Sequence, residues 1–358
     1  MEYETRGGRM THRAQVGRSE ATAKPPCGAA TAAAHPNIAL IEYWGKRDEE
    51  MVLPVRDSLS MTLSVFPTST TVRLSTTSPA DLVRINGEPA SAAPTLRIST
   101  FLAHDRELTG SDQPASVETT NSGPTGAGLA SSAAGFAARA AAATHAYGLR
   151  VDRRELSRLA RRGSGSAARS IFGGFVQWNA GVGLGATGDR SSYAEPLDGS
   201  ALDPAMVVTV VDAGPKPTPS REAMRHTAAT SPLYLPWANS CTDDLAQMRL
   251  AIAAGDLPRV GEIAEHNAFG MHATMWAARP ALWFLTPESL MVIDRISQLR
   301  QHGTPAYATI DAGPNVVALC SRRDADQVAQ YLRETTRNLA VHIALPGPAT
   351  TVSEASTR

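Results

Sequence analysis

The chain has 358 residues, of which 42% are hydrophobic and 19% are charged, a balance typical of a soluble globular protein with a sizeable core. Lys and Arg together number 34, as do Asp and Glu, so the net charge is zero and no nucleic-acid partner, which needs a basic surplus, is expected. Cys27, Cys241 and Cys320 are far apart and form no CxxC pair, so we expect reduced thiols in a cytoplasmic protein. No apolar run approaches the roughly 20 residues that span a bilayer, so no membrane contact is expected.

The two ends of the chain are predicted to be tails. Residues 1–28 are polar and rich in Arg, without the apolar core of a secretory signal. Residues 346–358 are rich in Pro, Ser and Thr. Folded structure is therefore expected between these ends, and the length suggests two domains or lobes.

The first folded segments predict strands, a hairpin and a helix. Thr31–Leu40 mixes small and apolar residues and could enter a strand, and Ser60–Leu74 has the Thr, Val and alternating apolar positions of strands. Leu82–Ile85 followed by Asn86-Gly87 predicts a hairpin, because Asn-Gly supplies the positive φ values of a type I′ turn. Leu96–Leu108 has apolar residues at helical spacing.

A glycine-rich loop at Asn121–Gly128 runs into an Ala-rich stretch that Gly148 ends. It is not a Walker A loop, because the Gly-Lys-Ser/Thr ending is missing. A loop of this kind that opens a small-residue helix suits close approach to a phosphate, since unpaired N–H groups and the helix dipole favour an anion. By composition alone, a Gly-punctuated loop before a packing helix is an equal alternative.

Two further segments could bind anions. A helix at Arg153–Arg162 leads into the small-residue loop Gly163–Arg169, where hydroxyls and exposed amides lie beside a guanidinium that can hold a carboxylate or phosphate with two donors. A solvent-exposed capping loop is the competing interpretation. Pro219-Ser220-Arg221, near Lys216, is a second and weaker candidate for contact with an anion.

The remaining chain predicts an α+β fold of two lobes. It contains a buried strand at Val207–Val211, helices at Cys241–Ala254, Leu257–Ala278 and Ser289–His302, and short strands at Ala306–Ile310, Val316–Leu319 and Leu339–Ala344. His266 and His272 lie six apart on one predicted helix, so a shared metal is not expected. Glu262 and Glu265 are interpreted as solvated helix residues.

Two short motifs leave structural and chemical interpretations open. Asn37–Lys46 ends in Tyr-Trp-Gly-Lys, which could place a phenol and a cation at the end of a strand, or could be an edge strand with a lysine that reaches solvent. Asp311 follows the apolar Ala308-Thr309-Ile310 and opens a Gly/Pro turn. An aspartate there either initiates the turn or is a catalytic carboxylate on a rigid strand end.

Six segments occur in the order found in one known family: HPNIALIEYWGKRDEE, LP-x-x-x-SLSMTL (Leu53–Leu63), PTGAGLASSAAGFAA, GSGSAARSIFGGFVQW, HNAFGMHATM and TIDAGPN. From about residue 30 to residue 345 the chain thus resembles the diphosphomevalonate decarboxylases of the GHMP kinase superfamily. The resemblance implies the two-lobed GHMP kinase fold: a ribosomal protein S5 domain 2-like, ATP-binding lobe at 29–205 and an α/β-sandwich lobe at 206–345.

The activity implied by the resemblance is the ATP-dependent decarboxylation of mevalonate 5-diphosphate to isopentenyl diphosphate, ADP, phosphate and CO2, with Mg²⁺ and in a homodimer. The residues implied as catalytic are Asp311, Arg169 and Lys46. Those implied as contacts to the substrate are Tyr43, Trp44, Gly45, Lys46, Arg97, Ser164, Gly165, Ser166, Ala167, Ala168, Arg169, Ser220 and Arg221. Those implied as contacts to ATP are Pro124, Gly126, Ala127, Gly128, Leu129, Ser131 and Ser132, and no protein ligand to a metal is implied.

Several residues depart from the pattern of the family. Glu42 stands where the family usually has Lys, and a reversed charge near phosphates should weaken binding by roughly 1–3 kcal/mol. Arg56-Asp57 replaces a frequent Asn, Pro219 a common Ser, and Gln177 a frequent Glu. These departures keep three alternatives open: a kinase that does not decarboxylate, a decarboxylase of mevalonate monophosphate or another 3-hydroxy acid, and a non-catalytic binding protein.

Overall fold

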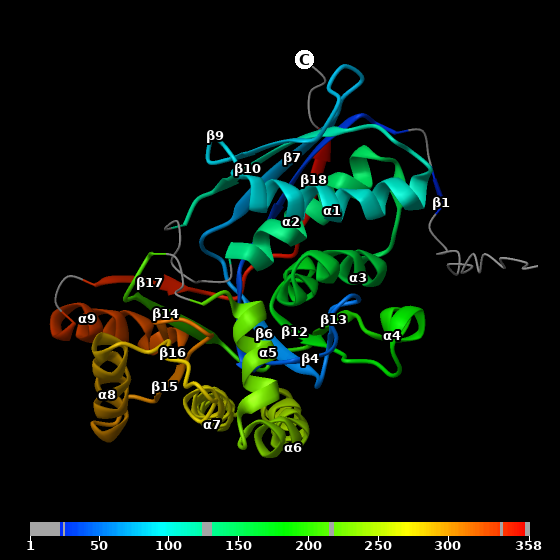
Figure 1. Ribbon diagram of the computed structural model, residues 1–358. Coiled ribbons are helices and arrows are strands. Elements are labelled where there is room, and N and C mark those ends of the chain that lie inside the picture. Colours follow the sequence, from blue (N-terminus) through cyan, green and yellow to red (C-terminus); the bar gives the residue numbers. More distant parts are fainter. Residues whose placement is uncertain (1–21, 24–25, 124–130, 215–217, 337–338, 355–358) are drawn as a thin grey trace, which may run out of the picture.

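The computed structural model describes residues 22–23, 26–123, 131–214, 218–336 and 339–354 (Figure 1). It forms two lobes, as expected. In the described residues no helix is both long and apolar enough to cross a membrane.

The first lobe contains two sheets. The larger has the strand order β18-β2-β7-β10-β8-β9, with bounds Thr351–Glu354, Ala29–Ala34, Thr68–Leu74, Ala115–Asn121, Leu82–Ile85 and Glu88–Pro89. The smaller has the order β13-β12-β6-β3, with bounds Ala194–Leu197, Phe175–Trp178, Ser58–Thr62 and Asn37–Ile41. Two short pairs complete the lobe: β4 (Lys46–Asp48) with β5 (Leu53–Pro54), and β1 (Thr22–Ala23) with β11 (Leu149–Arg150).

The second lobe is built on the four-stranded sheet β15-β16-β14-β17, with bounds Ala306–Thr309, Val316–Ser321, Pro204–Val210 and Ala340–Ala344. The α-helices are α1 (Ala92–Thr109), α2 (Ser131–Ala146), α3 (Arg153–Gly163), α4 (Gly185–Ser191), α5 (Ser220–Thr230), α6 (Tyr234–Ala254), α7 (Leu257–Trp276), α8 (Pro287–Gln301) and α9 (Ala325–Thr335). The 3-10 helices are η1 (Gly165–Ile171) and η2 (Arg322–Asp324).

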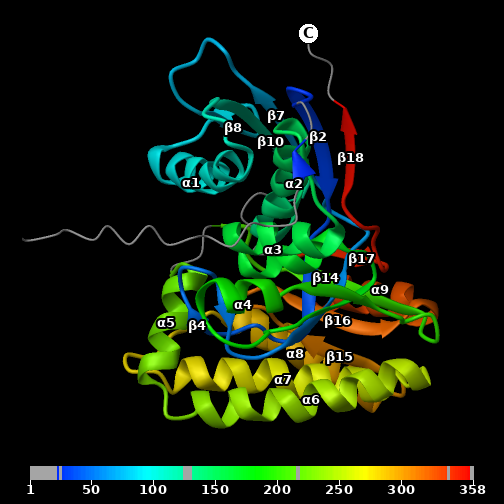
Figure 2. The ribbon, with the colours of Figure 1, turned by 90° about the vertical axis from the view of Figure 1, so that its right-hand side faces the viewer.

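Most of the predicted elements are confirmed. The Ala-rich segment forms α2, whose small side chains let it lie directly on β2 and β7 of the six-stranded sheet (Figure 2). Asn86 and Gly87 have φ values of 52° and 84°, as the type I′ hairpin between β8 and β9 requires. The predicted strand at Thr31–Leu40 is instead two strands, β2 and β3, that belong to different sheets.

The two ends of the described chain differ from the tails expected there. Thr351–Glu354 forms β18, which pairs antiparallel with β2 along the edge of the six-stranded sheet. Thr22–Ala23 pairs with β11. Polar composition predicted a tail, but main-chain hydrogen bonds to an open sheet edge do not need apolar side chains.

The lobes share one hydrophobic core through β3. All five residues of β3 are buried, and the strand packs against α7 as well as its own sheet. The Thr309 hydroxyl on β15 donates to the Ala39 carbonyl at 2.9 Å, which links the second lobe to β3. Residues that follow β3 and β15 are therefore held at the same junction.

Helices α3 and α4 are joined by a cluster of charges. Arg158, Arg161 and Arg162 on α3 all form ion pairs with Asp189 on α4. Arg161 is fully buried and also donates to the Ser192 and Met51 carbonyls. A buried charge needs such partners, so this network fixes α3 and, directly after it, η1.

One buried carboxyl group has no such network. Asp105 on α1 is 1% exposed, and among the described residues its Oδ2 atom has no hydrogen-bond partner. Burial raises the pKa of Asp105 to about 8, opposed by the nearby Arg106 charge. The folded state therefore keeps its proton at a pH where the unfolded chain has lost it, so this group lowers stability as the pH rises from about 4 to about 8.

We predict that Asp105→Asn stabilises the protein at pH 8.5 by roughly 1–3 kcal/mol, because the variant never carries the buried charge. The gain should shrink toward pH 5. Urea unfolding across this range measures it, with the exposed Asp112→Asn as a matched control. A gain that does not vary with pH would contradict the assignment.

Candidate active site

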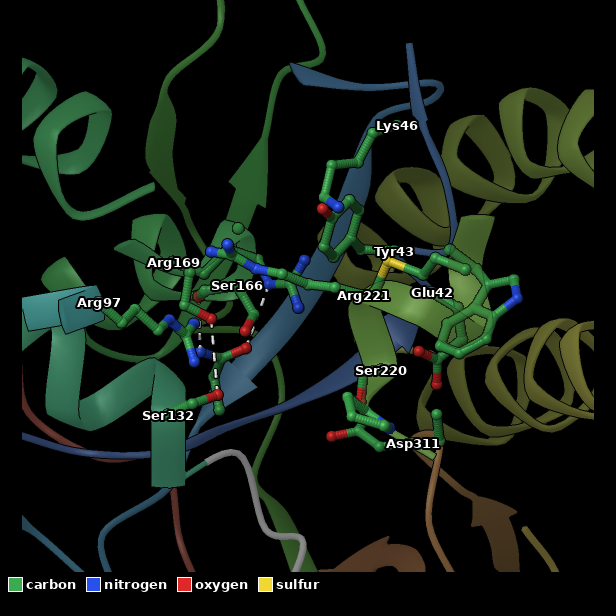
Figure 3. Close-up of a pocket in the computed structure, with 17 residues that line it drawn as sticks. Glu42, Tyr43, Lys46, Arg97, Ser132, Ser166, Arg169, Ser220, Arg221 and Asp311 are labelled. Atoms are coloured by element: carbon green, nitrogen blue, oxygen red, sulfur yellow. Dashed lines mark hydrogen bonds between the residues drawn. The ribbon is translucent and has the colours of Figure 1, made fainter. Parts of the chain in front are cut away.

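A cavity of about 250 Å³ opens where the two lobes meet (Figure 3). Its walls come from β3 and the residues after it, from the start of α5, from η1, and from the turn after β15. The residues that line it are Asn37, Glu42, Tyr43, Trp44, Lys46, Arg97, Ser132, Ser164, Gly165, Ser166, Arg169, Pro219, Ser220, Arg221, Met224, Asp311 and Ala312. Four cations and two carboxylates share this space, which suits a ligand with several negative charges.

The Tyr-Trp-Gly-Lys segment turns sharply after β3. Gly45 has a φ of 110°, and a Cβ added there would lie 1.8 Å from the Tyr234 hydroxyl oxygen, so only glycine fits the turn. Tyr43 packs edge-on against Trp178 with ring centroids 4.7 Å apart. Its buried hydroxyl has no partner among the described residues, and burial raises the pKa of Tyr43 well above its usual value. The phenol is thus a neutral donor available to a ligand.

Lys46 points into the cavity and does not reach out to solvent. Its side chain is 2% exposed, and Nζ donates to Glu49 Oε2 at 2.7 Å. Burial lowers the pKa of Lys46, and the Glu49 contact raises it in part. The alternative of a lysine that extends into solvent from an edge strand is wrong, since the apolar stem and the charge are both enclosed.

Arg169 is held rigidly at the base of the cavity. It lies on η1, where the sequence predicted a loop, and it is 3% exposed. Its Nε atom donates to Asn37 Oδ1 at 3.1 Å, and one terminal nitrogen donates to the Ser58 hydroxyl. Burial lowers the pKa of Arg169, while Asp311 and then Glu42 raise it. A guanidinium stays protonated even so, and its edge is preorganised for a planar anion.

Two more arginines converge at another wall of the cavity. Arg97 and Arg221 both donate to the Gly163 carbonyl, at 2.7 and 2.6 Å. Nearby, the hydroxyls of Ser132 and Ser164 lie 3.5 Å apart. Burial, followed by the Arg221 charge, lowers the pKa of Arg97 to about 10. Two like charges on one carbonyl create a strong site for an anion such as a phosphate or diphosphate.

Asp311 enters the cavity from the second lobe. It directly follows β15 and Ile310, which is fully buried. Asn315 holds the same turn, because its side-chain oxygen accepts from the Val211 and Asp212 amides. Asp311 is close enough to Arg169 to stabilise the charged guanidinium. The carboxylate thus stands on a rigid strand end and lines the same cavity as the arginine.

The structure brings together most of the predicted site residues. Ala167 and Ala168 are buried in η1 behind the wall, and Gly45 shapes the turn, so these three do not line the cavity. Ser131 opens α2. Ser132, the next predicted ATP contact, lines the cavity, and the remaining predicted ATP contacts lie outside the described residues: Pro124, Gly126, Ala127, Gly128 and Leu129.

Asn37 is a site residue that the sequence reasoning missed. It accepts from Arg169 and donates to the Ser166 carbonyl and the Ser170 hydroxyl, so it couples β3 to η1. The apolar motif around Asn37 predicts a strand, but an amide within such a strand gives no sign of its partner. Met224 and Ala312 also line the cavity and were not predicted.

One expectation needs correction, and two departures from the family pattern differ in where they lie. Glu265 is not a solvated helix residue: it accepts from Arg300 at 2.9 Å and from the Ala308 amide at 2.8 Å, and so fixes β15 behind Asp311. Arg56 does not line the cavity. It donates to the Ala238 carbonyl on α6, which makes this departure structural. Glu42 does line the cavity and is 5% exposed.

Two family models cover most of the chain. The diphosphomevalonate decarboxylase-like N-terminal domain matches residues 34–194, and the mevalonate 5-diphosphate decarboxylase C-terminal domain matches residues 206–348. The chain belongs to the diphosphomevalonate decarboxylase family. This confirms the resemblance and the two-domain GHMP kinase fold expected from it.

Curated members of this family align over most of their length. The diphosphomevalonate decarboxylase of Candida albicans is 36% identical over 83% of this chain and 85% of its own. The human enzyme is 37% identical over 82% of this chain and 76% of its own.

Solved structures agree with this assignment. The mevalonate diphosphate decarboxylase of Enterococcus faecalis is 40% identical with a TM-score of 0.86, over 91% of this chain and 99% of that one. A structure of MDDEF in complex with MVAPP, AMPPCP and magnesium is also 40% identical, with a TM-score of 0.87 over the same shares. The Staphylococcus aureus enzyme is 38% identical, with a TM-score of 0.87 over 91% of this chain and 98% of its own.

Glu42 provides a test of the charge in the cavity. We predict that Glu42→Gln tightens the binding of inorganic pyrophosphate roughly 5- to 100-fold, because one buried negative charge is removed from an anion site. Isothermal titration calorimetry measures the change. Glu50→Gln, at an exposed position, should alter the affinity less than about twofold. Equal affinity in Glu42→Gln and the wild type would show that Glu42 does not act on the bound anion.

Proposed function

We propose that this protein catalyses the ATP-dependent decarboxylation of mevalonate 5-diphosphate to isopentenyl diphosphate, ADP, phosphate and CO2. One observation carries the proposal: a single cavity is lined by Arg169 and Asp311 and, at another wall, by the Arg97–Arg221 pair. The substrate has the matching groups, with a carboxylate and a C3 hydroxyl at one end and a diphosphate at the other. The family and its bound ligands support the same assignment.

Arg169 would bind the C1 carboxylate of the substrate. Asn37 and Ser58 occupy its Nε and one terminal nitrogen, so the orientation of the guanidinium plane is set before the ligand arrives. The remaining donors can hold the carboxylate in one orientation. This aligns the C1–C2 bond of the substrate for loss of CO2.

Asp311 would act on the C3 hydroxyl. Its carboxylate accepts the hydroxyl hydrogen and directs the oxygen at the γ-phosphate of ATP, as an orienting group or a general base. When phosphate later leaves C3, positive charge develops at that carbon, and the same carboxylate stabilises it. Arg169 and Asp311 attract each other electrostatically, which favours the charged guanidinium.

The nucleotide would approach from the N-terminal end of α2. Ser132, in the first turn of this helix, lines the cavity, so the helix start opens toward the substrate. Free N–H groups of a first turn suit a phosphate. The structure shows no group of three or more His, Cys, Asp or Glu side chains able to hold a metal among the described residues. Mg²⁺, present in a complex of a homologue, would neutralise the charge of the ATP phosphates.

We further propose, from the resemblance to the family, that the protein is a homodimer in the cytoplasm. The free thiols of Cys27, Cys241 and Cys320 are compatible with a reducing compartment. Light scattering coupled to size-exclusion chromatography tests the dimer, and elution as a monomer at micromolar concentration would refute it.

Product analysis tests the proposed reaction. Mass spectrometry after incubation with Mg-ATP and mevalonate diphosphate should show isopentenyl diphosphate with one ADP and one CO2 per turnover. Mevalonate monophosphate and free mevalonate serve as competing acceptors. ADP without CO2 would identify a kinase, and preferential turnover of the monophosphate would identify a decarboxylase of another acceptor.

We predict that Asp311→Asn lowers kcat by about 10²–10⁴-fold, because the amide can neither accept the proton nor stabilise positive charge at C3. ATP binding, followed by a fluorescent analogue, should change little. An equal loss of binding and turnover would make Asp311 a structural residue.

A second variant addresses the carboxylate contact. Arg169→Lys should lower kcat roughly 10²-fold, because a point charge can contact Asn37 or Ser58 but cannot also hold both carboxylate oxygens in plane. Thermal unfolding serves as the folding control. Near-normal turnover by a folded variant would remove Arg169 from the mechanism.

A further inference from the structure

Arg139, in the middle of α2, is a buried cation with few polar partners among the described residues. Its neighbours in the helix are mostly alanines, and it is 4% exposed. In the described part of the chain no carboxylate forms an ion pair with it, and its Nε atom has no hydrogen-bond partner. Within the described ranges, the side-chain hydrogen bond that Arg139 makes is a long one, 3.4 Å to the Thr119 hydroxyl. A buried charge with so little compensation lowers the stability of the fold, so we expect the charge of Arg139 to have a functional role.

The ring of Phe136 connects Arg139 to the cavity. The guanidinium carbon of Arg139 lies 4.5 Å from the ring centroid, and that of Arg97 lies 4.4 Å from the same centroid. One aromatic ring thus attracts two cations, one buried beneath the cavity and one lining it. The two charges also act on each other, because Arg97 lowers the pKa of Arg139.

Phe136 also supports the carbonyl on which Arg97 and Arg221 meet. A Cβ added to Gly163 would lie 1.9 Å from the ring, so the backbone of Gly163 rests directly on Phe136. The Gly163 carbonyl accepts from both arginines. Arg139, Phe136 and Gly163 therefore form a support beneath this end of the cavity, which we name the α2 platform.

We propose that Arg139 is a positioning residue for the diphosphate end of the substrate: through Phe136 it keeps Arg97 extended into the cavity, and its own charge favours a diphosphate over a monophosphate. This inference rests on the proposed function. The buried charge adds a positive potential that water screens poorly, and the added attraction grows with the negative charge of the ligand. Repulsion between the two guanidinium groups also disfavours any movement of Arg97 back toward α2.

Arg139→Met, which keeps much of the side-chain volume without the charge, tests the proposal, and Arg139→Lys restores the charge. For Arg139→Met we expect KM for mevalonate diphosphate to rise about tenfold and KM for mevalonate monophosphate about threefold or less, with kcat within twofold. Arg139→Lys should recover most of the affinity. The Tm of Arg139→Met should equal or exceed that of the wild type, because an uncompensated buried charge is gone.

Two results would overturn the assignment. Unchanged KM values for both acceptors would show that the charge does not reach the site. A loss of Tm together with kcat, without rescue by Arg139→Lys, would show that Arg139 only supports the fold.

Binding of inorganic pyrophosphate and inorganic phosphate, measured by calorimetry on the wild type and Arg139→Met, separates this inference from the proposed function. If the wild type does not turn over mevalonate diphosphate, the proposed reaction fails. The proposed role of Arg139 is still supported if Arg139→Met weakens pyrophosphate binding about tenfold and phosphate binding less. Equal affinities in both proteins would refute it.

Discussion

The contact between Arg169 and Asn37 is the constraint on which the active site depends. It joins η1 to β3, and β3 is the strand against which both lobes pack. Arg169 is 3% exposed, and Asn37 and Ser58 supply hydrogen bonds that offset the cost of burying its charge. The same two contacts fix the orientation in which Arg169 meets a substrate. The hydrogen bonds that offset the burial of the charge are therefore also the ones that orient it for binding.

The cavity offers two separate groups of cations to the anionic groups of a substrate. Arg169 and Asp311 line the cavity and attract each other electrostatically, and Arg97 and Arg221 share the Gly163 carbonyl. A substrate with a carboxylate at one end and a diphosphate at the other can enter in only one orientation if each group meets its own cations. That orientation places the C3 hydroxyl near Asp311, so substrate binding and alignment for reaction follow from the same distribution of charge.

Local patterns predicted local structure well. The Asn86-Gly87 turn and the Ala-rich helix α2 depend on nearest neighbours and on the conformations that each residue type allows. Tyr43, Lys46 and Asp311 could be selected because the motifs around them match a family, and the structure places all three on one cavity.

Long-range pairing could not be predicted in this way. Strand β18 forms because β2, about 320 residues earlier in the chain, leaves an edge of the first sheet open, which the polar sequence of 351–354 does not show. Likewise, Glu265 on α7 accepts from the Ala308 amide, and Arg56 donates to the Ala238 carbonyl on α6. Both partners are far away in the sequence. The separate roles of Arg97 and Arg139 on one ring are visible only when α1 and α2 are placed side by side.

The most direct test of this account is a crystal structure with mevalonate diphosphate bound. The account predicts the carboxylate against Arg169, the diphosphate across Arg97 and Arg221, and the C3 hydroxyl within hydrogen-bond reach of Asp311. A substrate bound in the opposite direction, with its diphosphate on Arg169, would contradict the assignment of both ends of the cavity.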